Sequence, residues 1–486
     1  MATRRPTVEF LDDALTDSII DEALELLSTI GVFIENAGAR SLLADAGATR
    51  QSSAGRVLIP RAVVEQGLHS APQEITLYDS SGSKSFVVGG NHVHFDPGSA
   101  GLRIHDHAGR VARPAVTEDL VRFHRLTQAL AYLDFQSTGL ISSDVPGQAS
   151  DAYRLFQALQ WCAKPIITGT FVVEGFAPMA EMLAIVRGGS RELAEKPLAI
   201  FDACPSPPLT WTNLTTQSVI DCARAGIPSE FVAMPLTGAT APVTLGGALV
   251  QHTAENLAGL VIAELARPGA QVIFGGSPAS FDMRTGNPPM GAMETMMIDC
   301  GYAQVGKRLK LPTHAYMGLS DAKVLDAQAG LESGMGALLA ALAGINVVSG
   351  PGMMDYETTQ SLEKLVIDNE ICGMALRMID GITPREKPLA LHLFQEMGAH
   401  PDFLTHPHTL QWLRQEHRFP RVLERGNYQQ WEAGGKLSVG DRASLEVERI
   451  LNTERVSVLS QDMRQELSTV MLSHLKTYGG VLLPAM

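Results

Sequence analysis

Cysteine is scarce in this chain. Five cysteines are spread over 486 residues, and no two of them stand at the spacing of a CxxC motif. An odd number of dispersed thiols does not suit a disulfide-bonded scaffold or a zinc site built from thiolates. The cysteine content therefore indicates a reducing compartment, and we expect a cytoplasmic location.

Positive charge is also in short supply. The 38 lysines and arginines stand against 52 aspartates and glutamates, which leaves a formal net charge of −14 at pH 7. A net-acidic surface repels nucleic-acid phosphates and anionic lipid headgroups, so the composition argues against a nucleic-acid or membrane-surface partner. Hydrophobic residues make up 45% of the chain, which is enough for a substantial core, and we expect a soluble globular enzyme.

Uninterrupted apolar segments long enough to cross a bilayer are missing. Residues 231–254 and 333–354 contain no aspartate, glutamate, lysine or arginine, but prolines or glycines interrupt both of them. We interpret each as a buried strand and a buried helix joined by a loop, and not as a membrane span. The basic residues near the start of the chain are not followed by the apolar run of a secretory signal.

The motifs of common nucleophilic and phosphate-binding enzymes are absent. The sequence contains no GxSxG elbow, no HExxH helix and no GxxxxGK[ST] loop. His92 and His94 would share one face of a strand and could bind a metal together with His314. This pattern leaves a metal-dependent barrel hydrolase as an alternative, although both histidines of the pair precede the strand–helix repeats, and two ordinary strand histidines are the simpler interpretation.

From about residue 115, apolar strand-like segments alternate with helical ones. The strand-like segments are 133–140, 165–171, 197–203, 229–234, 270–274, 313–317 and 345–349. Continuous apolar strands between amphipathic helices are typical of a parallel sheet covered on both faces, and seven of them favour an α/β fold of the (β/α)8 TIM-barrel type. We expect the eighth strand at 402–405. The predicted organisation is an N-terminal helical and β-rich extension over 1–114, the barrel over 115–408 and a C-terminal helical extension over 409–486.

In a TIM barrel, the carboxyl ends of the strands carry the functional site. Here those ends supply hydroxyl, carboxylate and aromatic side chains, and no nucleophile with an adjacent base. The candidate substrate-binding residues are Phe171, Asp202, Tyr316, Phe135, Gly139, Ser349 and Tyr356. We assign no catalytic acid, base or nucleophile, and no metal ligand.

Several short motifs, taken together and in order, resemble one known family. They include GATAPVTL at 238–245, ENLAGL at 255–260, DMRTG at 282–286, SDAK at 320–323, LVIDNE at 365–370 and FLTHPHTL at 403–410. Each motif is short, but their number and order resemble the trimethylamine methyltransferase family over nearly the whole chain, most densely between about residues 114 and 434.

The resemblance implies a (β/α)8 barrel that passes a methyl group from a methylated amine to the cobalt of a separate corrinoid protein. Archaeal trimethylamine enzymes of this family carry pyrrolysine, and this sequence contains no such residue. It therefore resembles the branch without pyrrolysine, which includes glycine betaine methyltransferases. The implied partners are a cognate corrinoid protein and a small quaternary amine, with cob(I)alamin supplied by the partner, no intrinsically bound cofactor, and homo-oligomerisation left open.

A quaternary ammonium suits this chemistry because it leaves as a neutral tertiary amine, whereas trimethylamine would leave as an amide anion unless its nitrogen were activated. The protein then has to hold a cation and orient one methyl group. Aromatic faces contribute about 0.5–2 kcal/mol each to such binding. We expect Phe171 and Tyr316 to form the main cage, Phe135 and Tyr356 to be lesser members, and Asp202 to place a charge beside the cation. A non-catalytic binder of betaine-like solutes is a further alternative.

Overall fold

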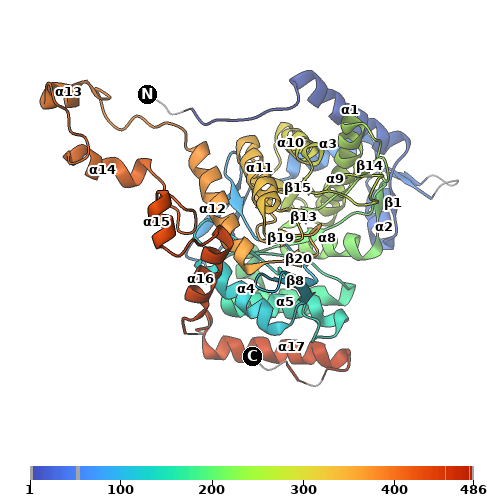
Figure 1. Cartoon of the computed structure of the whole chain (residues 1–486). Coiled ribbons are helices and arrows are strands. Elements are labelled where there is room, and N and C mark those ends of the chain that lie inside the picture. The colour runs from blue at the N-terminus through green and yellow to red at the C-terminus, as the bar shows by residue number, and fades with distance from the viewer. Residues whose placement is uncertain (1–3, 51–54, 455, 481, 484–486) are drawn as a thin grey trace.

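A parallel eight-stranded sheet curls into a barrel at the centre of the protein (Figure 1). The computed structural model describes residues 4–50, 55–454, 456–480 and 482–483. The strands, in their order around the sheet, are β6 (His94–Phe95), β18 (Val347–Ser349), β17 (Thr313–Tyr316), β15 (Val272–Gly276), β13 (Ser229–Phe231), β11 (Ala199–Ala203), β10 (Ile166–Thr168) and β9 (Gln136–Ser137). The Phe135 N–H donates to the Phe95 carbonyl across 3.3 Å, which joins the two edges of the sheet. The predicted barrel is confirmed.

Seven strands lie on the apolar segments that the sequence indicates, but the predicted position of the eighth strand is wrong. Residues 402–405 form no strand and lead into α14 (Pro407–Glu416). The eighth strand is β6, which comes from the segment before residue 115 and pairs with β18. A strand of only two residues has no periodicity that a sequence could reveal, so its identity depends on tertiary pairing alone.

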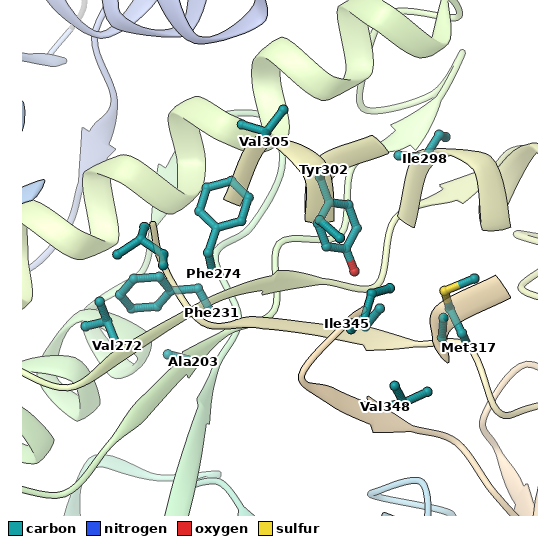
Figure 2. Close-up of a cluster of buried hydrophobic side chains, with 14 of the residues drawn as sticks. Ala203, Phe231, Val272, Phe274, Ile298, Tyr302, Val305, Met317, Ile345 and Val348 are labelled. Atoms are coloured by element: carbon teal, nitrogen blue, oxygen red, sulfur yellow. The ribbon is translucent and has the colours of Figure 1, made fainter. Parts of the chain in front are cut away.

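Helices that alternate with the strands cover the outside of the barrel. They are α4 (Thr117–Ala129), α5 (Ser150–Trp161), α6 (Phe176–Arg187), α8 (Asn213–Ala225), α9 (Leu245–Ala266), α10 (Met293–Arg308), α11 (Ala327–Ala343) and α12 (Leu362–Ile379), with the short α7 (Ser190–Glu195) after α6. Outward-facing Phe231 and Phe274 on the strands pack into one buried cluster with Tyr302 of α10 (Figure 2). Fully burying such a side chain contributes about 1.5–3 kcal/mol, so this layer is a main source of stability.

The N-terminal helices explain why the first part of α9, up to residue 254, contains no charged residue. Helices α1 (Asp13–Thr29), α2 (Ala37–Asp45) and α3 (Arg61–Ser70) all pack against α9. Since the barrel covers one side of α9 and these helices cover the other, most of its residues are buried, and an apolar composition on all sides is expected. No helix among the described residues is long and apolar enough to cross a membrane.

A hairpin closes the amino end of the barrel. It consists of β4 (Glu74–Tyr78) and β5 (Ser85–Gly89), which pair antiparallel. Ile75, Leu77, Phe86 and Val88 of the hairpin pack in one buried cluster with inward-facing residues of five strand segments. Small sheets complete the described chain: β1 (Phe33–Ile34) with β12 (Thr210–Trp211), β2 (Thr49–Arg50) with β3 (Val57–Leu58), β14 (Leu236–Thr237) with β16 (Ala279–Ser280), and β19 (Met353–Met354), β20 (Thr359–Gln360), β7 (Arg103–Asp106) and β8 (Val111–Pro114) in one sheet.

The chain after α12 is helical. α16 (Val439–Leu451) packs on α12 and α4, and α17 (Gln461–Thr477) packs on α5 and α6. One segment projects from the body of the protein (Figure 1). It follows α12 in the chain, precedes α16, and contains α13 (Leu391–Met397), α14 and α15 (Tyr428–Ala433). α14 and α15 contain no buried residue, so this segment contributes little to the core.

Candidate active site

Alternate residues of the barrel strands point inward and form two layers of different chemistry. The layer next to the β4–β5 hairpin is apolar and contains Phe135, Ile167, Ile200, Ile273 and Val347. Towards the carboxyl ends of the strands, the inward positions are polar. This second layer, which we call the polar layer, contains Asp96, Asp202, Glu230, His314 and Ser349. Asp202 is partly exposed as a residue, although its Oδ1 is buried.

A chain of contacts crosses the polar layer. The Ser349 hydroxyl lies 2.7 Å from Asp96 Oδ1, and His314 Nε2 lies 3.1 Å from the same hydroxyl. His314 Nδ1 lies 3.2 Å from Glu230 Oε1. Burial lowers the pKa of His314 to about 3, so its ring is neutral. If the Ser349 hydroxyl donates to Asp96, His314 Nε2 must donate to Ser349, which leaves Nδ1 as an acceptor facing Glu230.

Asp202 and Glu230 form the centre of this layer. They are register partners on β11 and β13, so their side chains lie beside each other on the inner face of the sheet. Burial, reinforced by the charge of Asp202, raises the pKa of Glu230 well above its usual range. Burial also raises the pKa of Asp202 to about 7, although its contact with Glu230 and the charge of Arg154 act in the opposite direction. At neutral pH the pair therefore retains at least one proton.

Glu357 approaches the polar layer from the loop between β19 and β20. Asp355, Tyr356 and Glu357 have φ angles of 51°, 55° and 64°, a left-handed conformation that residues with a side chain seldom adopt. Burial, and then the charge of Asp202, raises the pKa of Glu357 to about 8. Its Oε1 is buried without a hydrogen-bond partner among the described residues. The strained turn therefore holds another carboxyl group close to Asp202, and this group is mostly protonated at neutral pH.

Arg154 brings a positive charge to the same end of the barrel. It lies on α5, is 1% exposed, and donates from Nη1 to the Thr138 carbonyl at 2.8 Å, just beyond β9. Its guanidinium carbon lies 4.3 Å from the centre of the Phe171 ring, which follows β10. Burial lowers the pKa of Arg154 to about 10, with Asp151 and Asp202 opposing that shift, so the group stays charged at neutral pH.

Tyr316 connects the polar layer to an apolar wall. Its ring meets the His314 ring edge-on at 4.9 Å between centroids. It is 6% exposed and packs with Val232, Met290 and Met353. Burial raises the pKa of the Tyr316 phenol well above its usual range, so the hydroxyl keeps its proton. The site thus combines carboxyl groups, one aromatic ring and apolar side chains, a combination suited to a methylated cation.

The histidines of the hydrolase alternative do not form a common site. His94 Nδ1 lies 2.8 Å from Asp134 Oδ2 and His94 Nε2 lies 2.9 Å from the Val87 carbonyl, so both ring nitrogens already have partners. His92 is exposed at the amino end of the barrel. Among the described residues, no group of three histidine, cysteine or acidic side chains could hold a metal ion.

Comparison with known proteins identifies the family of the chain. A family model described as "Trimethylamine methyltransferase (MTTB)" matches residues 1–477. The chain belongs to the trimethylamine methyltransferase family. This methyltransferase is 28% identical, over 97% of its length and 94% of the relative's, to the trimethylamine methyltransferase MttB of Desulfitobacterium hafniense strain DSM 10664 / DCB-2. It is also 28% identical, over 98% of both chains, to the glycine betaine methyltransferase of Desulfitobacterium hafniense strain Y51.

A solved structure supports the fold of this methyltransferase. The crystal structure of the Methanosarcina barkeri monomethylamine methyltransferase superposes with a TM-score of 0.55 and 10% identity, covering 98% of this chain and 90% of that one. At this identity the likeness concerns the architecture only, which agrees with the barrel of eight parallel strands.

The structure brings together some of the residues that the sequence singles out. Asp202 and Ser349 lie in the polar layer, and Tyr316 lies beside it. Phe171, which is 36% exposed, stacks against the Arg154 guanidinium. Tyr356 stands in the strained loop next to Glu357, with the Lys323 amine 3.8 Å from the centre of its ring.

The structure does not bring Phe135 and Gly139 to this group. The Phe135 ring lies in the apolar layer and stacks on His94 at 4.9 Å, at the hairpin end of the barrel. A Cβ at Gly139 would lie 2.3 Å from Cζ of Phe123, so this glycine faces helix α4 and permits its close approach.

Sequence reasoning missed the acids Asp96, Glu230 and Glu357 and the base Arg154. Glu230 had a usable signal, because it is the one charged residue in the apolar segment 229–234, where a buried strand is expected. Asp96 directly follows β6, a strand that the sequence did not assign to the barrel, and Arg154 comes from a helix, so neither stands at the end of a predicted barrel strand. Glu357 reaches the layer through an unusual loop conformation that the sequence does not signal.

Proposed function

We propose that this methyltransferase takes a methyl group from a quaternary ammonium compound of the glycine betaine type and delivers it to a separate corrinoid protein. The observation that carries the proposal is the polar layer: buried carboxyl groups beside Tyr316, above an apolar layer of the barrel. The corrinoid, carried by its own protein, would supply a cobalt(I) nucleophile that accepts the methyl group. A quaternary nitrogen departs as a neutral tertiary amine, so no proton has to be delivered to it.

The tasks left to this chain are binding and orientation. Carboxyl groups that are neutral when the site is empty become ionised when a permanent cation lies beside them, because an opposite charge favours the charged form. Tyr316 can place its ring against the methyl groups, and proximity with correct orientation lowers the barrier of methyl transfer. Both features support a cationic donor, and a quaternary nitrogen carries its positive charge at every pH.

The relatives leave the donor open, since a trimethylamine methyltransferase and a glycine betaine methyltransferase are equally similar at 28%. The sequence contains only the standard amino acids, so the chain has no pyrrolysine to activate a tertiary amine. The absence of that residue supports a quaternary donor over trimethylamine.

The test is methyl transfer to free cob(I)alamin, followed by its absorbance change. We expect turnover with glycine betaine and much slower turnover with trimethylamine. Glu230→Gln should lower the rate, whereas Glu264→Gln, which changes a buried acid on the outer helix α9, should leave it unchanged. Equal turnover of trimethylamine and glycine betaine would contradict the proposed donor, and tight betaine binding without any methyl transfer would favour a non-catalytic binder.

A further inference from the structure

Arg154 is a buried cation without an ion pair. Among the described residues, no aspartate or glutamate makes a salt bridge with its guanidinium, and Nε is buried without a hydrogen-bond partner. Such a charge is costly to keep away from water unless something compensates for it. The contact with the Thr138 carbonyl satisfies only one of the five N–H groups of the guanidinium.

The nearest carboxylates act on Arg154 through their charge, but among the described residues none of them makes a salt bridge with it. Both carboxyl oxygens of Asp151 are already used, since Oδ1 accepts from the Ala152 N–H at 2.7 Å and Oδ2 accepts from the Phe171 N–H at 2.8 Å. Asp202 lies near enough for its charge to act on Arg154, but its Oδ1 is buried and finds no hydrogen-bond partner in the part of the chain that the structure describes. The guanidinium therefore keeps donor capacity that no described residue uses.

Phe171 determines which part of the guanidinium is available. Because the aromatic ring lies 4.3 Å from the guanidinium carbon and covers one face, hydrogen bonds must form at the edge, in the plane of the group. A carboxylate matches that edge, since it can accept two parallel N–H bonds. Phe171 itself is 36% exposed and follows β10, so solvent reaches this ring at the carboxyl end of the barrel.

We infer that Arg154 binds the carboxylate of a zwitterionic substrate, a trimethylammonium compound with a carboxylate a short distance from its nitrogen. The inference rests on the proposed function and names its substrate class more narrowly. The substrate carboxylate occupies the edge of Arg154, and its ammonium group lies against Asp202 and Glu230. Arg154 thus distinguishes betaines from choline and from tetramethylammonium, which carry the same cation and no carboxylate.

The experiment measures the affinity of the full-length protein for glycine betaine, choline and tetramethylammonium by calorimetry. Wild type should prefer glycine betaine to choline. Arg154→Gln should weaken glycine betaine binding about 10- to 150-fold, as expected for losing a charge-assisted hydrogen-bonded pair, and change choline binding by less than about 3-fold. Arg187→Gln is the matched control, because Arg187 bonds the Tyr78 and Asp79 carbonyls near the hairpin, away from the polar layer.

Three results would overturn the inference. If Arg154→Gln weakened the binding of all three ligands equally, Arg154 would only shape the site. If wild type bound choline as tightly as glycine betaine, the proposed function would stand and the inference would fail. If wild type bound no quaternary ammonium, both would fail. Should Arg154→Gln not fold, the methyl ester of glycine betaine tests wild type directly, since it loses the carboxylate charge at the cost of one added methyl group and should bind about 10- to 150-fold more weakly.

Discussion

Replacing Asp202 by asparagine removes the ionisable group of the polar layer with the pKa nearest to neutrality, about 7. The side chain keeps its size and its place beside Glu230, so the change isolates the charge. We expect tetramethylammonium, which has no titratable group, to bind wild type more tightly as Asp202 ionises. Asp202→Asn should bind it weakly at every pH.

The magnitude follows from the charge that is lost. Two unit charges about 4–5 Å apart interact by about 3–4 kcal/mol at an effective dielectric constant of about 20. Desolvation of both ions offsets part of this interaction, so we expect a loss of about 1.5–3 kcal/mol, or roughly 10- to 150-fold in affinity at pH 8. With a pKa of about 7, wild type should bind about tenfold more tightly at pH 8 than at pH 6.

Isothermal titration calorimetry from pH 5.5 to 8.5, in buffers of different ionisation enthalpy, measures both the affinity and the protons released. Glu255→Gln is the matched control, because burial also raises the pKa of this acid to about 7 but it lies on α9, bonded to the Leu209 N–H. That variant should keep the pH dependence. A wild-type affinity that does not change with pH, or an unchanged slope in Asp202→Asn, would refute the assignment of Asp202 as the counter-ion.

Three further predictions concern stability, the aromatic contact and metals. The pKa values of Asp202 and Glu357 are raised to about 7 and about 8 in the folded protein, so at these groups the folded state binds more protons than the unfolded state. The free energy of unfolding should therefore fall as the pH rises from about 6.5 to 8, above the range in which the lowered pKa of His314 acts in the opposite direction. Urea unfolding checks this, and a stability that rises over that window would contradict it. Tyr316→Ala and Phe171→Ala should each weaken quaternary ammonium binding about 2- to 30-fold. Phe274→Ala, in the buried cluster with Tyr302, should instead lower stability by about 3–5 kcal/mol. Calorimetry measures the first effect and thermal unfolding the second. Elemental analysis of the purified protein should find no stoichiometric zinc or cobalt.

The architecture could be predicted because the strands and helices differ in period. Seven buried strands appear in the sequence as short apolar segments, and the helices between them appear as amphipathic segments. Their order alone indicates a barrel. β6 could not be found in this way. Its two residues, His94 and Phe95, look like part of an N-terminal hairpin region, and only the pairing with β18 and the Phe135–Phe95 hydrogen bond place them in the sheet.

The candidate site was predictable only where a residue stands at a strand end. Asp202, Tyr316 and Ser349 satisfy that condition. Phe135 was a wrong choice because it lies near the beginning of a strand. Its side chain therefore packs against the β4–β5 hairpin and not at the carboxyl ends of the strands. Which acids meet inside the barrel depends on register, such as the pairing of Asp202 with Glu230, and register is a property of the assembled sheet.

The charge state of the assembled site links the role of Arg154 to that of the acids. At neutral pH His314 is uncharged, Glu230 and Glu357 hold protons, and Asp202 is close to half ionised, so the inside of the barrel supplies little negative charge to Arg154 beyond that of Asp151 on α5. A simple cation adds a positive charge to a site that already contains one, and it must drive protons from the acids in order to bind. A zwitterion adds no net charge, because its carboxylate meets Arg154 while its ammonium group meets Asp202. In a poorly hydrated barrel interior, where an uncompensated charge is expensive, this difference favours a betaine over choline even though the two ligands carry the same trimethylammonium group.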